Sequence, residues 1–209
     1  MNVTSTYIKW NVAIDLLTNL EKDAKEYGHY KFAMFFALGI YTGLRFSDLI
    51  RITWDNVLGQ DYIEISETKT KKYRKIKINP ELRKIIMRLY PKCDVHRDGE
   101  RILLNNRRCG KPFVHNTLNL NIKKTIEKYD IDNGKSRNYS THSLRKTFGR
   151  RVWEQHGESE KALILLNEIF NHMSIKDTIR YLGIRQQEIE AAYDCLSDRE
   201  SKNPIAYIP

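Results

Sequence analysis

The segment His29–Tyr41, HYKFAMFFALGIY, is apolar on nearly every side and constrains the fold more than any other stretch. A helix that is hydrophobic all round must be buried, and this one is too short to span a bilayer. We therefore expect a central helix that ends at Thr42 and Gly43. With 209 residues, 41% of them hydrophobic, the chain can bury a full core around it. We expect residues 1–209 to form a single domain.

Three further segments have the spacing or the end signals of helices around this centre. In Trp10–Tyr27 apolar residues recur at steps of three and four, which predicts an amphipathic helix. Asn79 followed by Pro80 is a good start for a helix that continues through Tyr90. Helical spacing resumes over His115–Tyr129. These helices predict a mostly α architecture.

The stretch Val57–Ile78 has a different period. Apolar and polar residues alternate in it, with a Gly-Gln turn first and a lysine-rich loop, Thr68–Lys72, second. Alternation of this kind predicts three short antiparallel strands. We therefore expect an α+β fold, mostly α, with a small three-stranded antiparallel sheet.

The charge of the chain points to a polyanionic partner. The net charge is +10, and its 36 Lys and Arg are mixed with 26 acidic residues along the whole length, which indicates a folded basic face and not a basic tail. Nucleic acid is the usual partner of such a face. No apolar span, basic amphipathic helix or secretory signal is recognisable, so we expect an intracellular, cytoplasmic protein that does not bind membranes.

The three cysteines are too few and too scattered for a disulfide framework and fit a reducing compartment. Cys93, His96, Cys109 and His115 form a set of potential zinc ligands. The second pair, however, is spaced differently from zinc fingers, and incidental residues of a surface loop explain the set as well. We expect no metal.

Groups suited to phosphate chemistry gather between Tyr139 and Leu182. His142 and Arg145 are three residues apart, so on a helix they can reach the same anion. His172 follows. Tyr181 comes near the end of a short segment that Ser174 can begin and Gly183 can stop, which places its phenol where it can project into a cleft.

A tyrosine that attacks a phosphodiester also needs positive charge, a proton acceptor and an acid. After the turn at Gly43, LRFSDLIRITWDNV is expected to be helical, with Arg45 and Asp48 on one face. The pair is either a surface ion pair or a buried arginine oriented by a carboxylate. The lysines of Thr68–Lys72 either are solvated or contact phosphate, and one of them is a candidate acid.

The order TGLRFSDL, TKT, THSLRKTF and NHMSIKDTIRYLGI resembles the catalytic domain of the tyrosine recombinases, the phage integrase family. The resemblance covers Ile40–Ile184 and implies a helical domain with a small sheet that clamps double-stranded DNA. It also implies the site: two arginines that hold the scissile phosphate, a hairpin lysine, two histidines, a nucleophile and an acid that steadies the first arginine. The two arginines are Arg45 and Arg145, and the lysine is Lys69. The histidines are His142 and His172, the nucleophile is Tyr181, and the acidic residue is Asp48.

The chemistry that the resemblance implies is site-specific recombination of DNA. Tyr181 attacks phosphorus and leaves a 3′-phosphotyrosyl link and a free 5′-hydroxyl, without ATP, metal or other cofactor. His142 is the expected base and Lys69 the expected acid, with Lys71 and Lys72 as neighbouring candidates. Two alternatives remain open: a type IB topoisomerase, and a non-catalytic DNA-binding regulator of the same fold.

The resemblance also bears on assembly. Most relatives carry an N-terminal helical domain, which we expect to be absent because so little precedes Thr42; the chain is either a short, single-domain recombinase or a catalytic fragment. Self-association on DNA in a tetrameric synapse is expected, and whether accessory DNA-bending proteins take part is left open. Residues 185–209 include an apolar stripe behind a polar link, Arg185–Gln187, and either exchange between protomers or dock on their own domain. The stripe consists of Ile189, Ala192, Tyr193 and Leu196.

Overall fold

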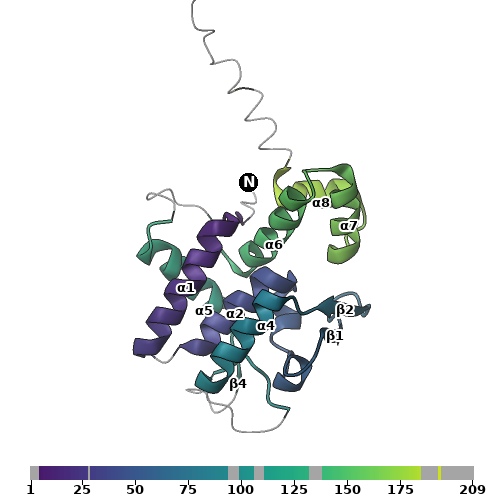
Figure 1. Ribbon diagram of the computed structural model, residues 1–209. Coiled ribbons are helices and arrows are strands. Elements are labelled where there is room, and N and C mark those ends of the chain that lie inside the picture. The colour runs from purple at the N-terminus through teal and green to yellow at the C-terminus, as the bar shows by residue number, and fades with distance from the viewer. Residues whose placement is uncertain are drawn as a thin grey trace, which may run out of the picture.

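The computed structural model describes residues 5–27, 29–93, 99–105, 111–131, 138–184 and Tyr193. The fold is mostly helical with small antiparallel sheets, as predicted (Figure 1). In chain order the elements are α1 (Trp10–Tyr27), α2 (Tyr30–Thr42), α3 (Phe46–Leu49), the 3₁₀ helix η1 (Trp54–Asn56), β1 (Tyr62–Ser66), β2 (Tyr73–Lys77), α4 (Pro80–Leu89), the 3₁₀ helix η2 (Tyr90–Lys92), β3 (Leu104–Asn105), β4 (Lys111–Pro112), α5 (His115–Lys128), α6 (Thr141–Gln155), α7 (Glu160–Phe170) and α8 (Ile175–Leu182).

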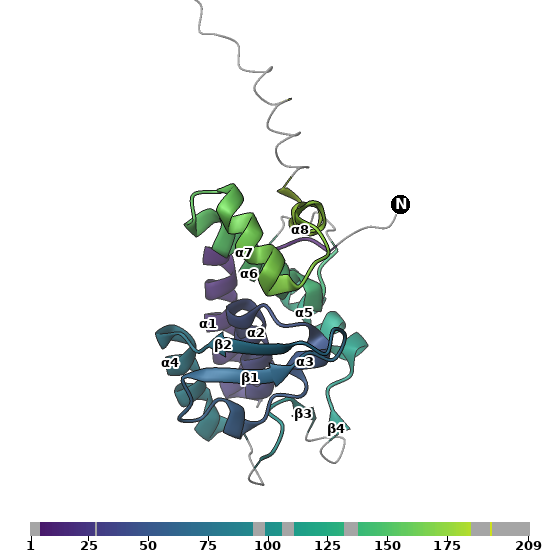
Figure 2. The same ribbon diagram turned by 90° about the vertical axis from the view of Figure 1, so that its right-hand side faces the viewer.

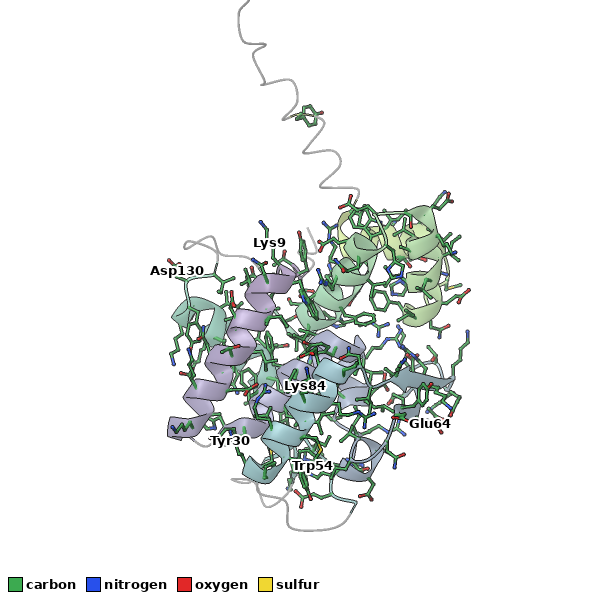
Figure 3. The ribbon with its side chains drawn as sticks, in the orientation of Figure 1. Lys9, Tyr30, Trp54, Glu64, Lys84 and Asp130 are labelled. Carbon is green, nitrogen blue, oxygen red and sulfur yellow. The ribbon has the colours of Figure 1, made fainter. Side chains whose placement is uncertain are left out.

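Helix α2 is the centre of the domain, as its composition predicts. It packs against α1, α4 and α6, and its residues from Lys31 to Ile40 are all buried. Helices α1 and α2 are antiparallel, so that Lys9, before α1, and Tyr30, at the start of α2, lie at opposite ends of α1 (Figure 3). Gly43 ends α2 with φ +61°, a backbone conformation that favours glycine.

The buried apolar residues form two clusters. The larger one joins α1, α2, α4 and α5, whereas the smaller one lies among α6, α7 and α8. Figures 1 and 2 both show these last three helices above the β1–β2 hairpin. Gly149 lets α7 and α8 approach α6 closely, because a Cβ there would lie 2.6 Å from Leu182 and 2.8 Å from Phe170.

Two local predictions were wrong. Only two strands, β1 and β2, pair in the stretch Val57–Ile78; the residues of the expected first strand form a turn after η1, where Gly59 has φ +68°. The helix expected after Gly43 is only the single turn α3. The chain leaves the helix after it, and the carbonyl of Ile52 accepts a hydrogen bond from the N–H of Ile102. Local patterns are overridden there by contacts with the segment around Ile102.

The capped helices are confirmed. The side chain of Asn79 accepts a hydrogen bond from the Leu82 N–H at the start of α4, and Ser174 accepts one from the Asp177 N–H at the start of α8. Helix α8 ends at Gly183, as predicted.

Some predictions fall outside the described residues. His96 and Cys109 of the zinc hypothesis do so, and so does the terminal stripe, with the exception of Tyr193. Within the described ranges, no group of three or more His, Cys, Asp or Glu side chains is placed to hold a metal ion. In the same ranges, no helix has the length and apolar character needed to cross a membrane.

Candidate active site

Two arginines from different helices meet at one backbone carbonyl. Arg45, the residue before α3, and Arg145, on α6, each donate an Nη2 hydrogen bond to the carbonyl oxygen of Phe170, at 2.9 and 3.0 Å. Arg145 also donates through Nη1 to the carbonyl of Gly43, and its guanidinium lies 4.3 Å from the centre of the Phe170 ring. The carbonyl of Phe170, the last residue of α7, thus brings both guanidinium groups together.

Arg145 is almost completely buried, with 2% of its surface exposed. Burial, followed by the repulsion of Arg45 and Arg74, lowers its pKa to about 10, although Tyr181 and Glu67 act in the opposite direction. The group therefore stays positive at neutral pH. A buried, fixed guanidinium can present two parallel donors to phosphate oxygens.

The carboxylate that pairs with Arg45 is Glu67, not Asp48. Glu67 Oε2 accepts from Arg45 Nη1 at 2.8 Å and from Thr70 Oγ1 at 2.7 Å, while its Oε1 accepts from Arg74 Nη1 at 3.0 Å. Glu67 is 1% exposed. Burial by itself would raise its pKa, but the bonds from Thr70 and Arg74 and the charges of both arginines outweigh it, so the net shift is downward. Glu67 fixes Arg45 to the hairpin.

Asp48 has another role than the sequence suggested. Its Oδ1 accepts from the backbone N–H of Thr68 at 2.8 Å, and no described group forms a hydrogen bond with its buried Oδ2. The spacing of three residues from Arg45 does not bring the two side chains together, because Arg45 lies before the first turn of α3 with extended backbone angles and reaches across to the hairpin. Asp48 instead holds the base of the lysine loop.

A buried carboxylate between two arginines predicts a specific dependence of stability on pH. The folded pKa of Glu67 lies below its ordinary value of 4.5, so its contribution is present above that pH and is lost as the pH falls through the folded pKa. We expect Glu67→Gln to lower the free energy of unfolding by about 3 kcal/mol at pH 7. The difference from the parent should shrink below pH 4.5. Urea unfolding of both proteins across this range measures it, and a difference that is constant with pH would contradict the ion-pair role.

Tyr181 lies on α8 beside this pair of arginines. Its Oη is buried, and no described group forms a hydrogen bond of good geometry with it. Arg145 nevertheless lies close enough to lower the pKa of the phenol. Burial raises the pKa of the phenol to about 12 against the influence of Arg145 and Arg45. The ring meets those of Phe170 and His172 edge to face, with centroids 5.5 and 5.2 Å apart. The phenol is therefore protonated at rest and needs a base.

Both predicted histidines lie at the site. His172 forms a hydrogen bond through Nδ1 with Thr178 Oγ1 at 3.0 Å, and burial, followed by the charges of Arg145 and Arg45, lowers its pKa to about 4. His142 follows the cap residue of α6 by two positions and keeps part of its surface open to solvent. Partial burial, then the charges of His115 and Arg145, lowers its pKa too. Both rings are therefore neutral at pH 7.

The three candidate lysines differ in their contacts. All three are exposed on the hairpin loop. Lys72 donates to the side chain of Asn171 at 2.6 Å, which ties the loop to the end of α7, and Lys71 has a left-handed φ of +59°. The charge of Lys69 is one of those that lower the pKa of His172, so Lys69 lies near that ring.

Four further groups at the site were missed or misread in the sequence. Glu67 and Arg74 face inward from the hairpin, and the Phe170 carbonyl is a backbone group with no sequence signal. His115, first considered only as a zinc ligand, forms a hydrogen bond with Thr141 Oγ1 at 2.9 Å next to His142. This hydrogen bond places the His115 ring beside the first residue of α6.

The assembled groups suit transfer of a phosphoryl group to tyrosine. Arg45 and Arg145 can serve as fixed positive donors for the non-bridging oxygens of a phosphodiester, and the Tyr181 hydroxyl can serve as a nucleophile. Neutral His142 can accept a proton, and an ammonium group on the loop can donate one.

Comparison with known proteins gives consistent results. The sequence model of the Phage integrase family matches residues 7–188. The chain is 29% identical over 174 residues to the probable integrase/recombinase YoeC of Bacillus subtilis (strain 168), covering 83% of this chain and 86% of that protein.

Solved structures share the fold at low sequence identity. They include XerA recombinase (TM-score 0.65, 19% identity, 94% of this chain and 65% of that chain). Another is a lambda integrase dimer bound to a COC′ core site (TM-score 0.59, 16% identity, 98% and 52%). The chain thus spans less than two thirds of the length of these two structures.

Proposed function

Because the chain belongs to the phage integrase family, we propose that it is a site-specific recombinase that cuts and rejoins double-stranded DNA through a covalent link to Tyr181. The observation that carries this proposal is the convergence of Arg45 and Arg145 on one point beside the buried phenol. Two fixed guanidinium forks next to a tyrosine are suited to a phosphodiester and to its transition state.

Cleavage exchanges one phosphodiester for another. The Tyr181 oxygen attacks phosphorus, the bond between phosphorus and the 5′-oxygen breaks, and a 3′-phosphotyrosyl link and a free 5′-hydroxyl result. The phenol gives its proton to His142, and Lys69 gives a proton to the departing 5′-oxygen. Arg45 and Arg145 hold the two non-bridging oxygens throughout. Rejoining is the reverse reaction with the 5′-hydroxyl of another strand.

The test is covalent capture from a pool of nicked duplexes with random sequence. A nick shortly downstream of the cleaved bond lets the short fragment that carries the new 5′-hydroxyl diffuse away, so that the covalent intermediate accumulates. Protein-linked DNA is recovered by denaturation and precipitation and then sequenced. We expect one enriched sequence, with the protein joined to its 3′ end; this sequence is called the captured duplex below. Adducts without sequence preference would favour a topoisomerase, and no adduct at all would favour a DNA-binding regulator.

The role of Lys69 predicts a chemical rescue. Lys69→Ala should cleave the captured duplex about 10²-fold more slowly than the parent, which is the size of a general-acid contribution. A duplex whose 5′-bridging oxygen is replaced by sulfur should restore the rate, because a thiolate leaves without an acid. Lys71→Ala and Lys72→Ala are the controls in the same loop. Neither should show a defect that sulfur rescues, since the bond from Lys72 to Asn171 holds the loop and not the leaving oxygen. Rescue of either control, and not of Lys69→Ala, would move the acid along the loop.

We also propose that the protein self-associates on DNA. The lambda integrase structure is described as a dimer on a core site, and XerH recombinase is described as bound to palindromic difH DNA. Strand exchange between two sites needs at least one active centre per cleaved strand, which four protomers supply. Residues 185–209 are the proposed exchanged segment.

Removal of that segment tests the assembly proposal. A protein that stops at Ile184 should bind one captured duplex nearly as tightly as the parent, because the phosphate contacts remain. The cooperativity factor for binding to two adjacent sites should fall by about ten-fold or more, because the contact that raises the effective concentration of the second protomer is lost. Native gel electrophoresis with one-site and two-site duplexes measures both quantities. Undiminished cooperativity would mean that the segment docks on its own domain.

A further inference from the structure

A short hydrogen-bonded relay lies behind the ring of His172. Nδ1 of His172 and Oγ1 of Thr178 are 3.0 Å apart, and Oγ1 of Thr178 donates to Oδ1 of Asn167 at 3.0 Å. Thr178 is fully buried on α8, and Asn167 lies on α7. The backbone carbonyl of Asn167 also accepts from the N–H of His172 at 3.1 Å. Asn167 therefore holds the histidine at its backbone directly and at its ring through Thr178.

The direction of the second bond decides which ring nitrogen carries the proton. A hydroxyl has one proton, and that of Thr178 goes to the Asn167 oxygen. Towards His172 the same hydroxyl can then only accept, so Nδ1 must be the N–H donor. A neutral imidazole has one N–H, which leaves Nε2 with a lone pair.

We propose that Asn167 and Thr178 are positioning residues that keep a proton on Nδ1 of His172, so that Nε2 takes up a second proton from solvent when the DNA phosphate arrives. This inference rests on the proposed function, because it concerns how His172 meets the scissile phosphate. A lone pair repels a phosphate oxygen, whereas the imidazolium donates a charged hydrogen bond to it.

The charges around the ring support this coupling. Arg145 on α6, Arg45 before α3 and Lys69 in the hairpin loop all oppose protonation, and Asp177 on α8 favours it. Burial and the first two charges hold the pKa of His172 at about 4, so the ring is neutral at pH 7 in the absence of DNA. Burial of the ring remains, but a bound phosphate adds negative charge where the arginines converge and so offsets their repulsion of the charged ring. Protonation and phosphate binding therefore favour each other.

The tautomer is measured directly by two-bond ¹H–¹⁵N NMR of the DNA-free protein labelled in its histidines, with His172→Gln to identify the signals. We expect neutral His172 with the proton on Nδ1. Thr178→Ser, which keeps the hydroxyl, and Asn167→Asp, which can only accept, should show the same tautomer. Thr178→Val should lose the preference, whereas Thr125→Val, which removes a buried hydroxyl from α5, should not. A proton on Nε2 in the parent protein would overturn the proposal, whatever the DNA experiments show.

Proton uptake is measured by calorimetry of binding to the captured duplex in two buffers of different ionisation enthalpy. The parent should take up more protons at pH 7 than His172→Gln; equal uptake would overturn the coupling. Thr178→Val should cleave roughly ten-fold or more slowly, with Thr178→Ser restoring the rate to within a few-fold. Cleavage in Thr178→Val at the parental rate and with the parental pH profile would show that the relay is only structural. Failure of the parent itself to form an adduct would instead refute the proposed function and leave the tautomer result standing.

Discussion

Tyr181→Phe should form no covalent adduct with DNA while it binds the captured duplex within about two-fold of the parental affinity, because one phenol oxygen is a small part of the phosphate contacts. The structure strengthens this expectation. The Tyr181 Oη has no hydrogen-bond partner of good geometry among the described residues, so the phenylalanine leaves no buried group unpaired. The ring contacts with Phe170 and His172 remain. The fold should be unchanged.

The measurement is gel analysis of protein-linked DNA beside an equilibrium binding titration at the same salt concentration. Tyr73→Phe is a suitable control, since Tyr73 is 62% exposed on the neighbouring hairpin and carries a phenol that the mechanism does not use. It should form adduct at the parental rate. An adduct formed by Tyr181→Phe would show that another residue is the nucleophile.

Arg145→Ala should lower the cleavage rate by 10²-fold or more at equal occupancy of the DNA, the scale of a lost donor to the transition-state oxygens. Arg145→Lys should recover little of this loss. One ammonium group cannot reproduce the planar fork that now reaches both the Gly43 and the Phe170 carbonyls. Single-turnover cleavage of the captured duplex at saturating protein measures the rate.

The matched control is Arg151→Ala. Arg151 lies on the same helix, but its guanidinium lies over the Trp10 ring, with its carbon 5.3 Å from the ring centre. Cleavage by this variant should stay near the parental rate. If Arg145→Ala also cleaves at that rate, with the loss confined to its stability, Arg145 serves only to join α2, α6 and α7.

The elements that could be predicted are those whose signals are local. Helix α1 begins and ends at the predicted residues, and the predicted starts of α4 and α8 are marked by side-chain caps from Asn79 and Ser174. Helix α2 was recognisable because a fully apolar segment has only one stable environment in a globular protein. The family resemblance then gave the candidate site residues in their chain order.

The partner of Arg45 shows what local patterns miss. Spacing within LRFSDL suggested Asp48, but the pairing carboxylate is Glu67, across the fold on the hairpin. One signal was present in the sequence. Ile63, Ile65 and Glu67 occupy every second position along β1 and its extension, so their side chains share the buried face. A carboxylate on a buried face needs a cation beside it. Arg74, paired with Ile65 in the sheet register, meets that need. The Phe170 carbonyl left no trace in the sequence, because every residue has one.

That carbonyl gives the unbound enzyme a substitute for its substrate. It is the last carbonyl of α7, one of the oxygens that a helix end leaves without a partner within the helix, and it carries part of the negative end of the helix dipole. Placed between Arg45 and Arg145, it screens two like charges that would otherwise push the site apart. In the proposed reaction a DNA phosphate meets two arginines that the carbonyl already holds close together, and it brings a full negative charge where the carbonyl brings a partial one.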